Sequence, residues 1–331
     1  MNAITRLTPH MQAYSDEFAD NGNINWLPYL MYFHPFGFSS PVVNTDASGF
    51  RYTEARNRSY SVADLKGESR VRVLAGSSTV FGIGASTDGH TLSARMTEND
   101  PGGSPWVNFG GRSFNSTQEM ILFSLHHSKL PMVDEIVLFS GFNDLGLARQ
   151  PKRYRGEHGA FFMYPDFFNA MAQKKPSRFS RWFGTDTADA PEAPPSLDEQ
   201  IDYAAGLMLR NLTSWKMFAD GLGAKLVFML QPLSNWVRQT GSPEEEILFS
   251  ELERRGRFAE TYGDILEAHA AQSYSNRLAE GAEALGVKFV DLAPLIARQA
   301  RPEQWIFVDR IHFTDDGHDF VSKIVLDAIS T

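Results

Sequence analysis

The amino-acid sequence predicts an α/β protein, a three-layer α/β/α sandwich built on a mainly parallel five-stranded sheet of the flavodoxin-like kind. From about Arg70 onward, short apolar runs rich in β-formers alternate with longer amphipathic stretches, which is the pattern of βα units. The chain has 331 residues, of which 42% are hydrophobic and 21% charged, values typical of a globular protein with a packed core. No run approaches the roughly 18 apolar residues that a membrane span requires.

Five short apolar segments are expected to form the strands, at residues 71–75, 105–109, 135–141, 224–232 and 287–292. The third segment is apolar almost throughout, which predicts a buried central strand. Helices are expected from about Ser116 to His127, from near Leu197, from Ser242 to Gly286 with a break near Gly256 or Gly263, and from Thr314 to Ile329. Ser242 is the expected N-cap of its helix, because Pro243 follows at the first position and Glu245 at the third.

Two regions do not follow this alternation. Residues 1–69 contain many aromatic, Gly, Asn and Ser residues without sustained periodicity, so we expect an N-terminal extension packed on a main domain at 70–331. Residues 145–196 separate the third strand from its helix by far more than the roughly two to six residues of an ordinary βα loop. Long loops at the carboxyl ends of parallel strands build sites in such folds, which favours a cap-like insertion beside the active site. Its aromatic cluster at 161–168 is equally compatible with a small subdomain core or an oligomer contact, and residues 185–196 have the composition of a linker.

The composition excludes several classes of function. The chain has 31 Lys+Arg against 40 Asp+Glu, a net charge of −9, and no clustered basic face that would bind nucleic acid. It has no cysteine, so a covalent catalyst must be Ser, Thr, Lys or a carboxylate. No His-Glu-x-x-His or comparable cluster is present, so we expect no catalytic metal and no cofactor. Residues 1–23 lack the apolar core of a secretory signal, which predicts a cytoplasmic protein unless a leader was removed.

Four short segments at strand ends carry polar groups that fit one mechanism, and the first two supply a hydroxyl and backbone amides. Gly76-Ser77-Ser78 follows the first strand, where a strand-to-helix turn exposes a serine hydroxyl and outward-pointing N–H groups. Taken alone, such a turn is more often a helix N-cap. The segment 108–119 follows the second strand, and its glycine-rich turn either donates backbone amides to an oxyanion or simply caps the next helix.

The third and fourth segments supply an amide, a carboxylate and an imidazole. Gly141-Phe142-Asn143-Asp144 ends the buried strand, where Asn143 either donates its amide into a site or belongs to a turn with an Asx cap. The fourth segment, 309–314, places Asp309 three residues before His312. A carboxylate that accepts a hydrogen bond from Nδ1 fixes the tautomer and leaves Nε2 as a base. Together with Ser78, these residues make up a nucleophile, a base and an orienting acid.

The order Gly-x-Ser, Asn-x-Gly with a helix start, Gly-x-Asn-Asp and a near-C-terminal Asp-x-x-His resembles the SGNH (GDSL-type) hydrolase superfamily over about residues 70–331. The resemblance implies that Ser78 is the nucleophile, His312 the general base and acid, and Asp309 the residue that orients the imidazole. It also implies an oxyanion hole formed by the N–H of Ser78, a backbone N–H of the segment 108–119, and the side-chain amide of Asn143.

The sequence departs from the pattern of that superfamily at two positions. Ser77 stands where an Asp usually precedes the nucleophile, a change that affects no atom of the triad. Counting from Asn108, the position of the second-segment glycine falls on Ser113. Only its N–H is needed, so Ser113 can serve if its backbone angle permits, and Gly110 is the fallback donor.

The resemblance implies a bacterial-type serine esterase that works through an acyl-enzyme on a small-molecule or glycan ester. Gln231 and Trp236 follow the fourth strand and would suit a carbohydrate bearing an acetyl ester, although a turn role for Gln231 is the alternative. The aromatic cluster at 161–168 would instead line an acyl-chain groove, as in a lipase or thioesterase. An O-acyltransferase on glycans would use the same triad, and a non-catalytic glycan-binding protein is the remaining alternative. The sequence leaves open whether the protein is a homo-oligomer.

Overall fold

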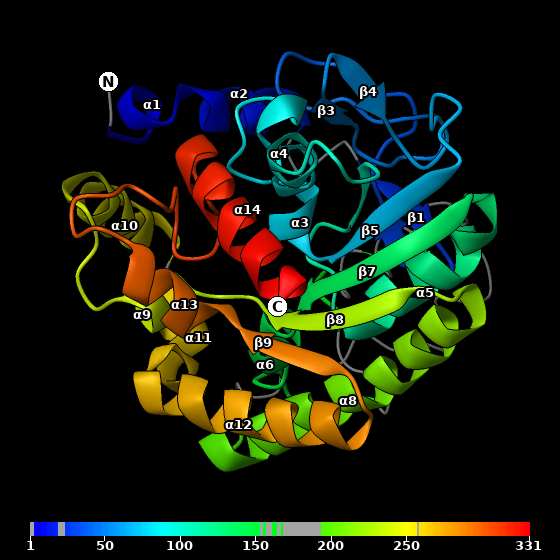
Figure 1. Cartoon of the computed structure of the whole chain (residues 1–331). Coiled ribbons are helices and arrows are strands. Elements are labelled where there is room, and N and C mark those ends of the chain that lie inside the picture. The colour runs from blue at the N-terminus through cyan, green and yellow to red at the C-terminus, as the bar shows by residue number, and fades with distance from the viewer. Residues whose placement is uncertain are drawn as a thin grey trace, which may run out of the picture.

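The computed structural model describes residues 3–18, 24–152, 155–156, 161–163, 167, 193–256 and 258–331. A five-stranded sheet lies at its centre, with the strand order β6-β5-β7-β8-β9 and every neighbouring pair parallel. The strands are β5 (Arg70–Gly76), β6 (Trp106–Gly110), β7 (Met132–Ser140), β8 (Lys225–Leu230) and β9 (Lys288–Asp291). Figure 1 shows this sheet crossing the molecule between helices on both faces. The predicted α/β/α sandwich on a five-stranded parallel sheet is confirmed.

Two helical layers cover the sheet, formed by α4 (Leu92–Asn99), α13 (Leu292–Gln299) and α14 (Asp315–Ser330) on one face and by α5 (Ser116–His126), α8 (Leu197–Leu222) and α12 (Ala268–Ala284) on the other. Successive strand residues point to opposite faces. Val73 and Phe228 therefore pack in the cluster of α5, α8 and α12. Leu74 and Met229, their neighbours in sequence, pack with α4, α13 and α14. Because both faces are covered, these strands are apolar almost throughout.

The five strands of the sheet and the helical regions that the sequence predicts begin and end within three residues of the predicted bounds. The helical region after Ser242 divides into α10 (Pro243–Gly256), α11 (Phe258–Tyr262), a 3₁₀ turn η5 (Gly263–Leu266) and α12. The break is therefore at the predicted glycines: Gly256 ends α10, and Gly263 has a φ of 52°. Three short helices follow strand ends directly, namely α3 (Ser78–Phe81), α6 (Phe142–Leu147) and α9 (Ser234–Val237). Periodicity does not reveal them, because one turn or little more contains no repeat.

The N-terminal residues form two short helices and two hairpins, α1 (Ala3–Leu7), α2 (Pro9–Phe18), β1 (Asn25–Leu27) with β2 (Met31–Phe33), and β3 (Thr53–Ala55) with β4 (Arg58–Tyr60). They lie against the turn that follows β5, where the ring of Phe18 stacks on Phe81 with centroids 5.6 Å apart. The buried guanidinium of Arg51 pairs with Asp88 at 2.7 Å and donates to the carbonyl of Gly82 at 2.8 Å. Two further 3₁₀ turns are η1 (Asp88–His90) and η2 (His127–Lys129).

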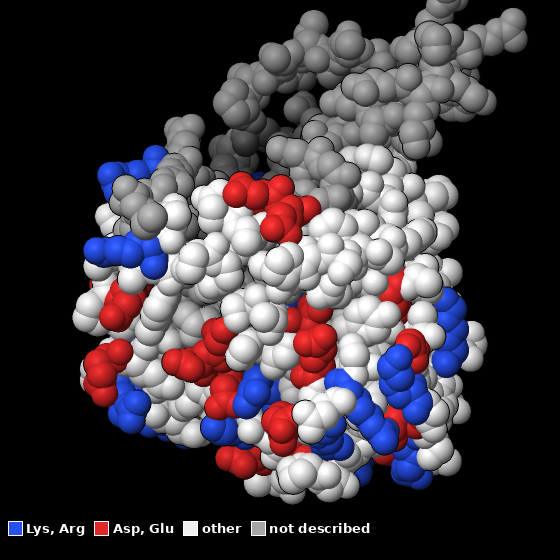
Figure 2. Space-filling view, turned by 90° about the horizontal axis from the view of Figure 1, so that it is seen from above, with Lys and Arg blue, Asp and Glu red and all other residues white. Residues whose placement is uncertain are grey.

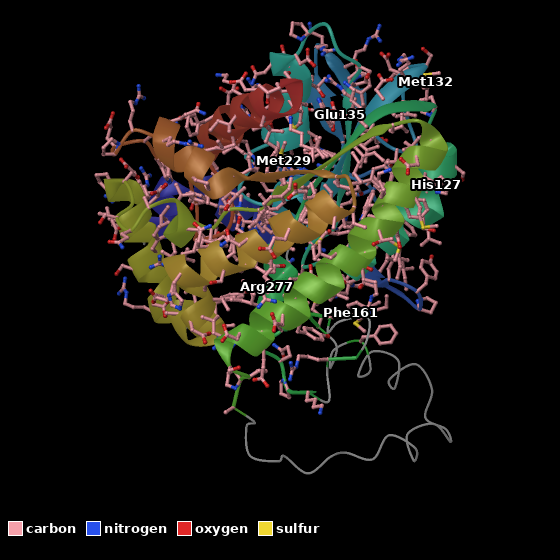
Figure 3. All side chains as sticks on the ribbon, turned by 60° about the horizontal axis from the view of Figure 1, so that its bottom comes forward. His127, Met132, Glu135, Phe161, Met229 and Arg277 are labelled. Carbon is pink, nitrogen blue, oxygen red and sulfur yellow. The ribbon has the colours of Figure 1, made fainter. Side chains whose placement is uncertain are left out.

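Most of the predicted insertion at 145–196 lies outside the described residues, including most of the linker at 185–196. Within the predicted aromatic cluster at 161–168, residues 164–166 and 168 also lie outside them. Phe161, Met163 and Phe167 pack against the core cluster that contains α8, and Phe167 meets Trp26 with ring centroids 5.9 Å apart. Figure 3 shows Phe161 near α8 and apart from Met132 at the start of β7. A cap beside the active site therefore stays a prediction.

None of the helices in the described ranges combines the length and the apolar composition needed to cross a bilayer. On the face seen in Figure 2, basic and acidic side chains are interspersed over the part that carries charge.

Candidate active site

Ser78 is the first residue of α3, directly beyond the carboxyl end of β5. The first N–H groups of a helix have no partner within the helix, so the N–H of Ser78 points outward together with its side chain. Gly82 ends α3 after a single turn, and its φ of 96° is a left-handed conformation that favours glycine. The turn that carries Ser78 is therefore tight, and 8% of the surface of Ser78 stays exposed.

The structure brings Ser78, His312 and Asp309 together across 234 residues of sequence. The Oγ of Ser78 lies 2.8 Å from Nε2 of His312, and Nδ1 of His312 lies 2.7 Å from Oδ2 of Asp309. The other carboxylate oxygen, Oδ1, accepts hydrogen bonds from the N–H groups of Ile311 and His312, both at 2.7 Å. Asp309 therefore fixes both the imidazole and the backbone that carries it.

The charge state of Asp309 determines the tautomer of His312. Desolvation opposes ionisation of this carboxyl, but the charge of His312 and the hydrogen bonds from His312 and Ile311 outweigh it and hold its pKa below the ordinary value. An ionised carboxylate only accepts hydrogen bonds, so Nδ1 of His312 must carry the proton. Nε2 is then the lone-pair atom that faces the Ser78 hydroxyl.

The loop after β6 presents Ser113 in an unusual backbone conformation. Its φ is 57°, in the left-handed region that non-glycine residues seldom adopt. This is the position where the superfamily has glycine, and the serine takes up the angle that glycine would favour. Asn115 then caps α5 by accepting from the N–H of Gln118 in a complete capping box. No hydrogen bond among the described residues uses the Ser113 N–H, so this donor is available.

The N–H of Gly110, the predicted fallback donor, already has a partner within the protein. Its N–H donates to Oδ1 of Asn108 at 2.9 Å and is therefore already used. A Cβ at this position would lie 2.1 Å from the backbone nitrogen of Phe81, so glycine is required here by the close packing of β6 against α3. The sequence shows the glycine but not the reason for it.

Asn143 reaches the same region from the other side of β5. Gly141 has a φ of 104° and turns the chain from β7 into α6, which places Asn143 in the first turn of that helix. One N–H of its amide donates to the carbonyl of Phe114 at 2.7 Å. The amide nitrogen has two hydrogens, so a second remains for a ligand. The strands that precede these two residues, β6 and β7, flank β5 in the sheet, and the bond to Phe114 brings Asn143 beside the loop that carries Ser113.

Asp144 has a structural role that the local sequence does not distinguish from an Asx cap. Its carboxyl accepts from the N–H of Ser116 at 3.1 Å and from the hydroxyl of Ser116 at 2.6 Å, so it joins α6 to the start of α5. Asn211 of α8 donates to the same hydroxyl at 2.8 Å. Burial of Asp144, only partly offset by these hydrogen bonds, raises the pKa of its carboxyl to about 7.

This pKa predicts a pH-dependent difference in stability between the wild type and Asp144→Asn. An unfolded Asp titrates near pH 3.9, so the folded protein retains a proton that the unfolded chain releases between about pH 4 and 7. This stabilisation is fully present below the pKa of Asp144 in the unfolded chain, and it is lost as the pH rises through the pKa of Asp144 in the folded protein. Lowering the pH from about 7.5 to about 5 should therefore raise the unfolding free energy of the wild type, relative to the variant, by roughly 2 kcal/mol. Urea titrations of both proteins at both pH values measure this change. A difference in unfolding free energy between wild type and variant that is the same at both pH values would contradict the prediction.

The two predicted substrate-binding residues both have partners within the protein. Gln231 is 1% exposed, and its amide oxygen accepts from the hydroxyl of Ser77 at 3.0 Å, so it ties β8 to the residue before the nucleophile. The indole N–H of Trp236 donates to the carbonyl of Ile265 at 3.0 Å. A contact of either residue with substrate stays a prediction.

A pocket of about 230 Å³ lies beside Asp309, and most of its wall is apolar. It is formed by α10, α11 and the loop before α14, and its lining is Phe249, Leu252, Glu253, Phe258, Tyr262, Asp309, Arg310 and Ile311. Burial, with the charge of Asp309, raises the pKa of Tyr262 to about 12, so its phenol is neutral. The carboxylate of Glu253 accepts from the N–H of Ala259 at the start of α11. Apolar volume is therefore available next to the Ser78, His312 and Asp309 cluster.

No protein-family model matches the chain, and no curated protein does. Among solved structures, the chain is similar to the acetyl xylan esterase AlAXEase, at 13% identity and a TM-score of 0.42, over 78% of this chain and 99% of that one. A lipase/acylhydrolase from Enterococcus faecalis has 12% identity and a TM-score of 0.42, over 78% and 95% of the two chains. A member of the lipolytic G-D-S-L family from Veillonella parvula has 10% identity and a TM-score of 0.46, over 79% and 98%.

Proposed function

We propose that this protein is a serine ester hydrolase that acts through an acyl-enzyme, with Ser78 as nucleophile. The observation that supports this best is the continuous chain of contacts from Ser78 Oγ to His312 Nε2 at 2.8 Å and from His312 Nδ1 to Asp309 at 2.7 Å. A hydroxyl is a weak nucleophile unless a base accepts its proton as it attacks. The geometry provides that base, with a carboxylate fixed behind it.

In the first half of the reaction, Ser78 Oγ attacks the carbonyl carbon of the ester while Nε2 of His312 takes the hydroxyl proton. The resulting imidazolium is stabilised by the negative charge of Asp309, which lies 2.7 Å from Nδ1. When the bond to the alcohol oxygen breaks, Nε2 returns the proton to that oxygen and the alcohol leaves. The acyl group remains bonded to Ser78 Oγ.

In the second half, water repeats the attack on the acyl-enzyme. Nε2 of His312 takes a proton from the water as its oxygen bonds to the acyl carbon, and then gives it to Ser78 Oγ as that bond breaks. A carboxylic acid is released and the serine is restored. The overall reaction consumes one ester and one water and gives one acid and one alcohol, with no cofactor.

The negative charge that develops on the carbonyl oxygen needs donors that are already in place. We assign these to the N–H of Ser78, the N–H of Ser113 and the second amide hydrogen of Asn143. The supporting observations are the helix-start position of Ser78, the left-handed backbone of Ser113 and the hydrogen bond that holds Asn143 to Phe114. Removal of one such donor typically costs about 10²- to 10³-fold in kcat.

The substrate class that we propose first is an O-acetyl ester of a carbohydrate or another short-chain ester. Asn235 and Arg310 support it. Arg310 follows Asp309 in the chain and its guanidinium donates to the amide oxygen of Asn235 at 2.8 Å, and an amide and a guanidinium suit the hydroxyls of a sugar. The test is a panel of acetylated sugars and acyl esters, each with and without a sugar acceptor. Release of acetate at equal rates in both conditions supports a hydrolase. An acylated sugar formed only with the acceptor would instead show the O-acyltransferase that shares this triad.

The apolar pocket beside Asp309 favours a second candidate, an esterase or thioesterase for a longer acyl chain. Under this function, p-nitrophenyl octanoate is hydrolysed with a higher kcat/KM than the acetate, and Leu252→Trp, which fills the pocket, lowers octanoate hydrolysis on the order of tenfold. The same substitution leaves acetate hydrolysis unchanged. Leu125→Trp is the matched control, because Leu125 is 44% exposed on α5. If the protein prefers acetate and Leu252→Trp does not alter that preference, the longer-chain candidate is excluded and the short-chain esterase remains.

A further inference from the structure

The N-terminal segment 24–34 is hydrogen-bonded directly to the loop that carries Ser113. The hydroxyl of Tyr32 donates to the carbonyl of Ser113 at 2.9 Å. The N–H of Arg112 donates to Nε2 of His34 at 3.2 Å. At the start of α5, the amide of Gln118 donates to the carbonyl of Leu30 at 2.8 Å. Tyr32 and His34 are 3% and 1% exposed, so the contacts are interior ones.

The conformation of Ser113 needs such support. A serine with a φ of 57° is less stable than the same residue in an ordinary conformation, by roughly 1–2 kcal/mol. If the loop relaxed to a negative φ, the peptide groups on both sides of Ser113 would rotate and its N–H would turn. The donor that we assign to the oxyanion hole therefore depends on interactions that hold this one residue in place.

The loop is held from two sides, through successive carbonyl groups. The Ser113 carbonyl accepts from Tyr32 of the N-terminal segment, and the Phe114 carbonyl accepts from Asn143 of α6. The ring of Tyr32 also packs edge-on against Phe114, with centroids 5.6 Å apart. The side chain of Asn143 belongs to the site itself, so Tyr32 is the anchor that comes from outside the main domain.

His34 is a second residue of the N-terminal segment that holds this loop, and its hydrogen-bond partners determine which ring nitrogen carries the proton. Its Nδ1 lies 3.0 Å from the carbonyl of Gly49, which only accepts, so Nδ1 carries the proton and Nε2 accepts from Arg112. Burial, with the charge of Arg112, holds the pKa of His34 well below its ordinary value, so the ring is neutral and this arrangement persists.

We propose that the N-terminal segment is a working part of the active site, with Tyr32 as a positioning residue that holds Ser113 in the conformation its N–H needs to stabilise the oxyanion. This inference rests on the proposed function. It gives residues 24–34 a role in the rate of the reaction, beyond packing on the core.

The test compares Tyr32→Phe with Tyr203→Phe in the full-length protein. Tyr203 is a matched control, since its hydroxyl also donates to a backbone carbonyl at 2.9 Å, that of Gly156, but from α8. Loss of one neutral hydrogen bond at Tyr32 should lower kcat for p-nitrophenyl acetate by about 3- to 10-fold. KM should not change, because the lost interaction acts only on the transition state. Tyr203→Phe should leave both kinetic constants within twofold of the wild type.

A second variant separates positioning from a general loss of structure. Glycine adopts a positive φ about as readily as a negative one, so Ser113→Gly removes the need for the anchor. In the Ser113→Gly background, adding Tyr32→Phe should lower kcat by less than twofold, whereas a merely structural role would leave its effect unchanged. Equal kcat values for wild type, Tyr32→Phe and Tyr203→Phe would overturn the positioning role of Tyr32 and leave the proposed function intact. A wild type without Ser78-dependent hydrolysis would overturn the proposed function as well.

Discussion

Ser78→Ala should lower kcat for ester hydrolysis on the order of 10⁶-fold, because it removes the atom that forms the acyl-enzyme. The side chain loses only its Oγ, whose recorded partner is Nε2 of His312, so the fold should be retained. Steady-state kinetics on p-nitrophenyl acetate, with thermal unfolding of the same preparations, measure both quantities. Any hydrolysis that remains reflects substrate binding and the oxyanion donors without the nucleophile.

Ser77→Ala is the control for this prediction, because the substituted residue is adjacent and chemically identical. Ser77 donates to the amide oxygen of Gln231 at 3.0 Å and makes no hydrogen bond with His312 among the described residues. Loss of that one neutral hydrogen bond should reduce kcat by less than about tenfold. If Ser78→Ala retained a tenth of the wild-type rate, or Ser77→Ala were the more damaging change, the nucleophile would be assigned to the wrong residue.

Asp309→Asn should lower kcat by about 10⁴-fold through the tautomer of His312. The carboxamide oxygen at 309 can still accept from the N–H groups of Ile311 and His312, which keeps the loop in place. Its NH₂ group would then face Nδ1 of His312 as a donor. Nδ1 becomes an acceptor, the ring proton moves to Nε2, and Nε2 can no longer take the proton of Ser78.

The matched control for Asp309→Asn is the same substitution at a carboxylate outside the site. Asp319 pairs with Arg95 of α4 at 2.7 Å, so Asp319→Asn should lower stability and leave kcat within twofold. Nitrogen NMR of labelled histidine reports the tautomer of His312 independently of activity. A loss of less than tenfold in Asp309→Asn, or a proton still on Nδ1, would contradict the assigned role of Asp309.

The sheet and its principal helices could be predicted because their signals are local. Residues 135–141 are apolar on both faces because helices cover both faces of β7, and the Ser242-Pro243 start of α10 is a capping pattern contained within a few residues. The approximate positions of Ser78, Asn143 and His312 followed from the ends of these elements. Parallel strands bring their carboxyl ends to one edge of the sheet, which places residues distant in sequence close together.

The rest of the site depends on contacts that no local pattern records. The hydrogen bond from Tyr32 to Ser113 spans 81 residues, and the one from Ser77 to Gln231 spans 154. No pattern in the local sequence of these four residues indicates that they pair. The same holds for Gly110, because the sequence does not show that its N–H donates to Oδ1 of Asn108.

The central claim is that Ser78 is an activated nucleophile, and its most direct test is labelling with a fluorophosphonate followed by peptide mass spectrometry. An activated serine oxygen bonds to phosphorus and displaces fluoride, a reaction that an ordinary serine does not undergo. We expect one adduct, on the peptide that contains Ser78, and none on that peptide in folded Ser78→Ala. Absence of an adduct from folded wild-type protein, or an adduct that persists in Ser78→Ala, would contradict the account.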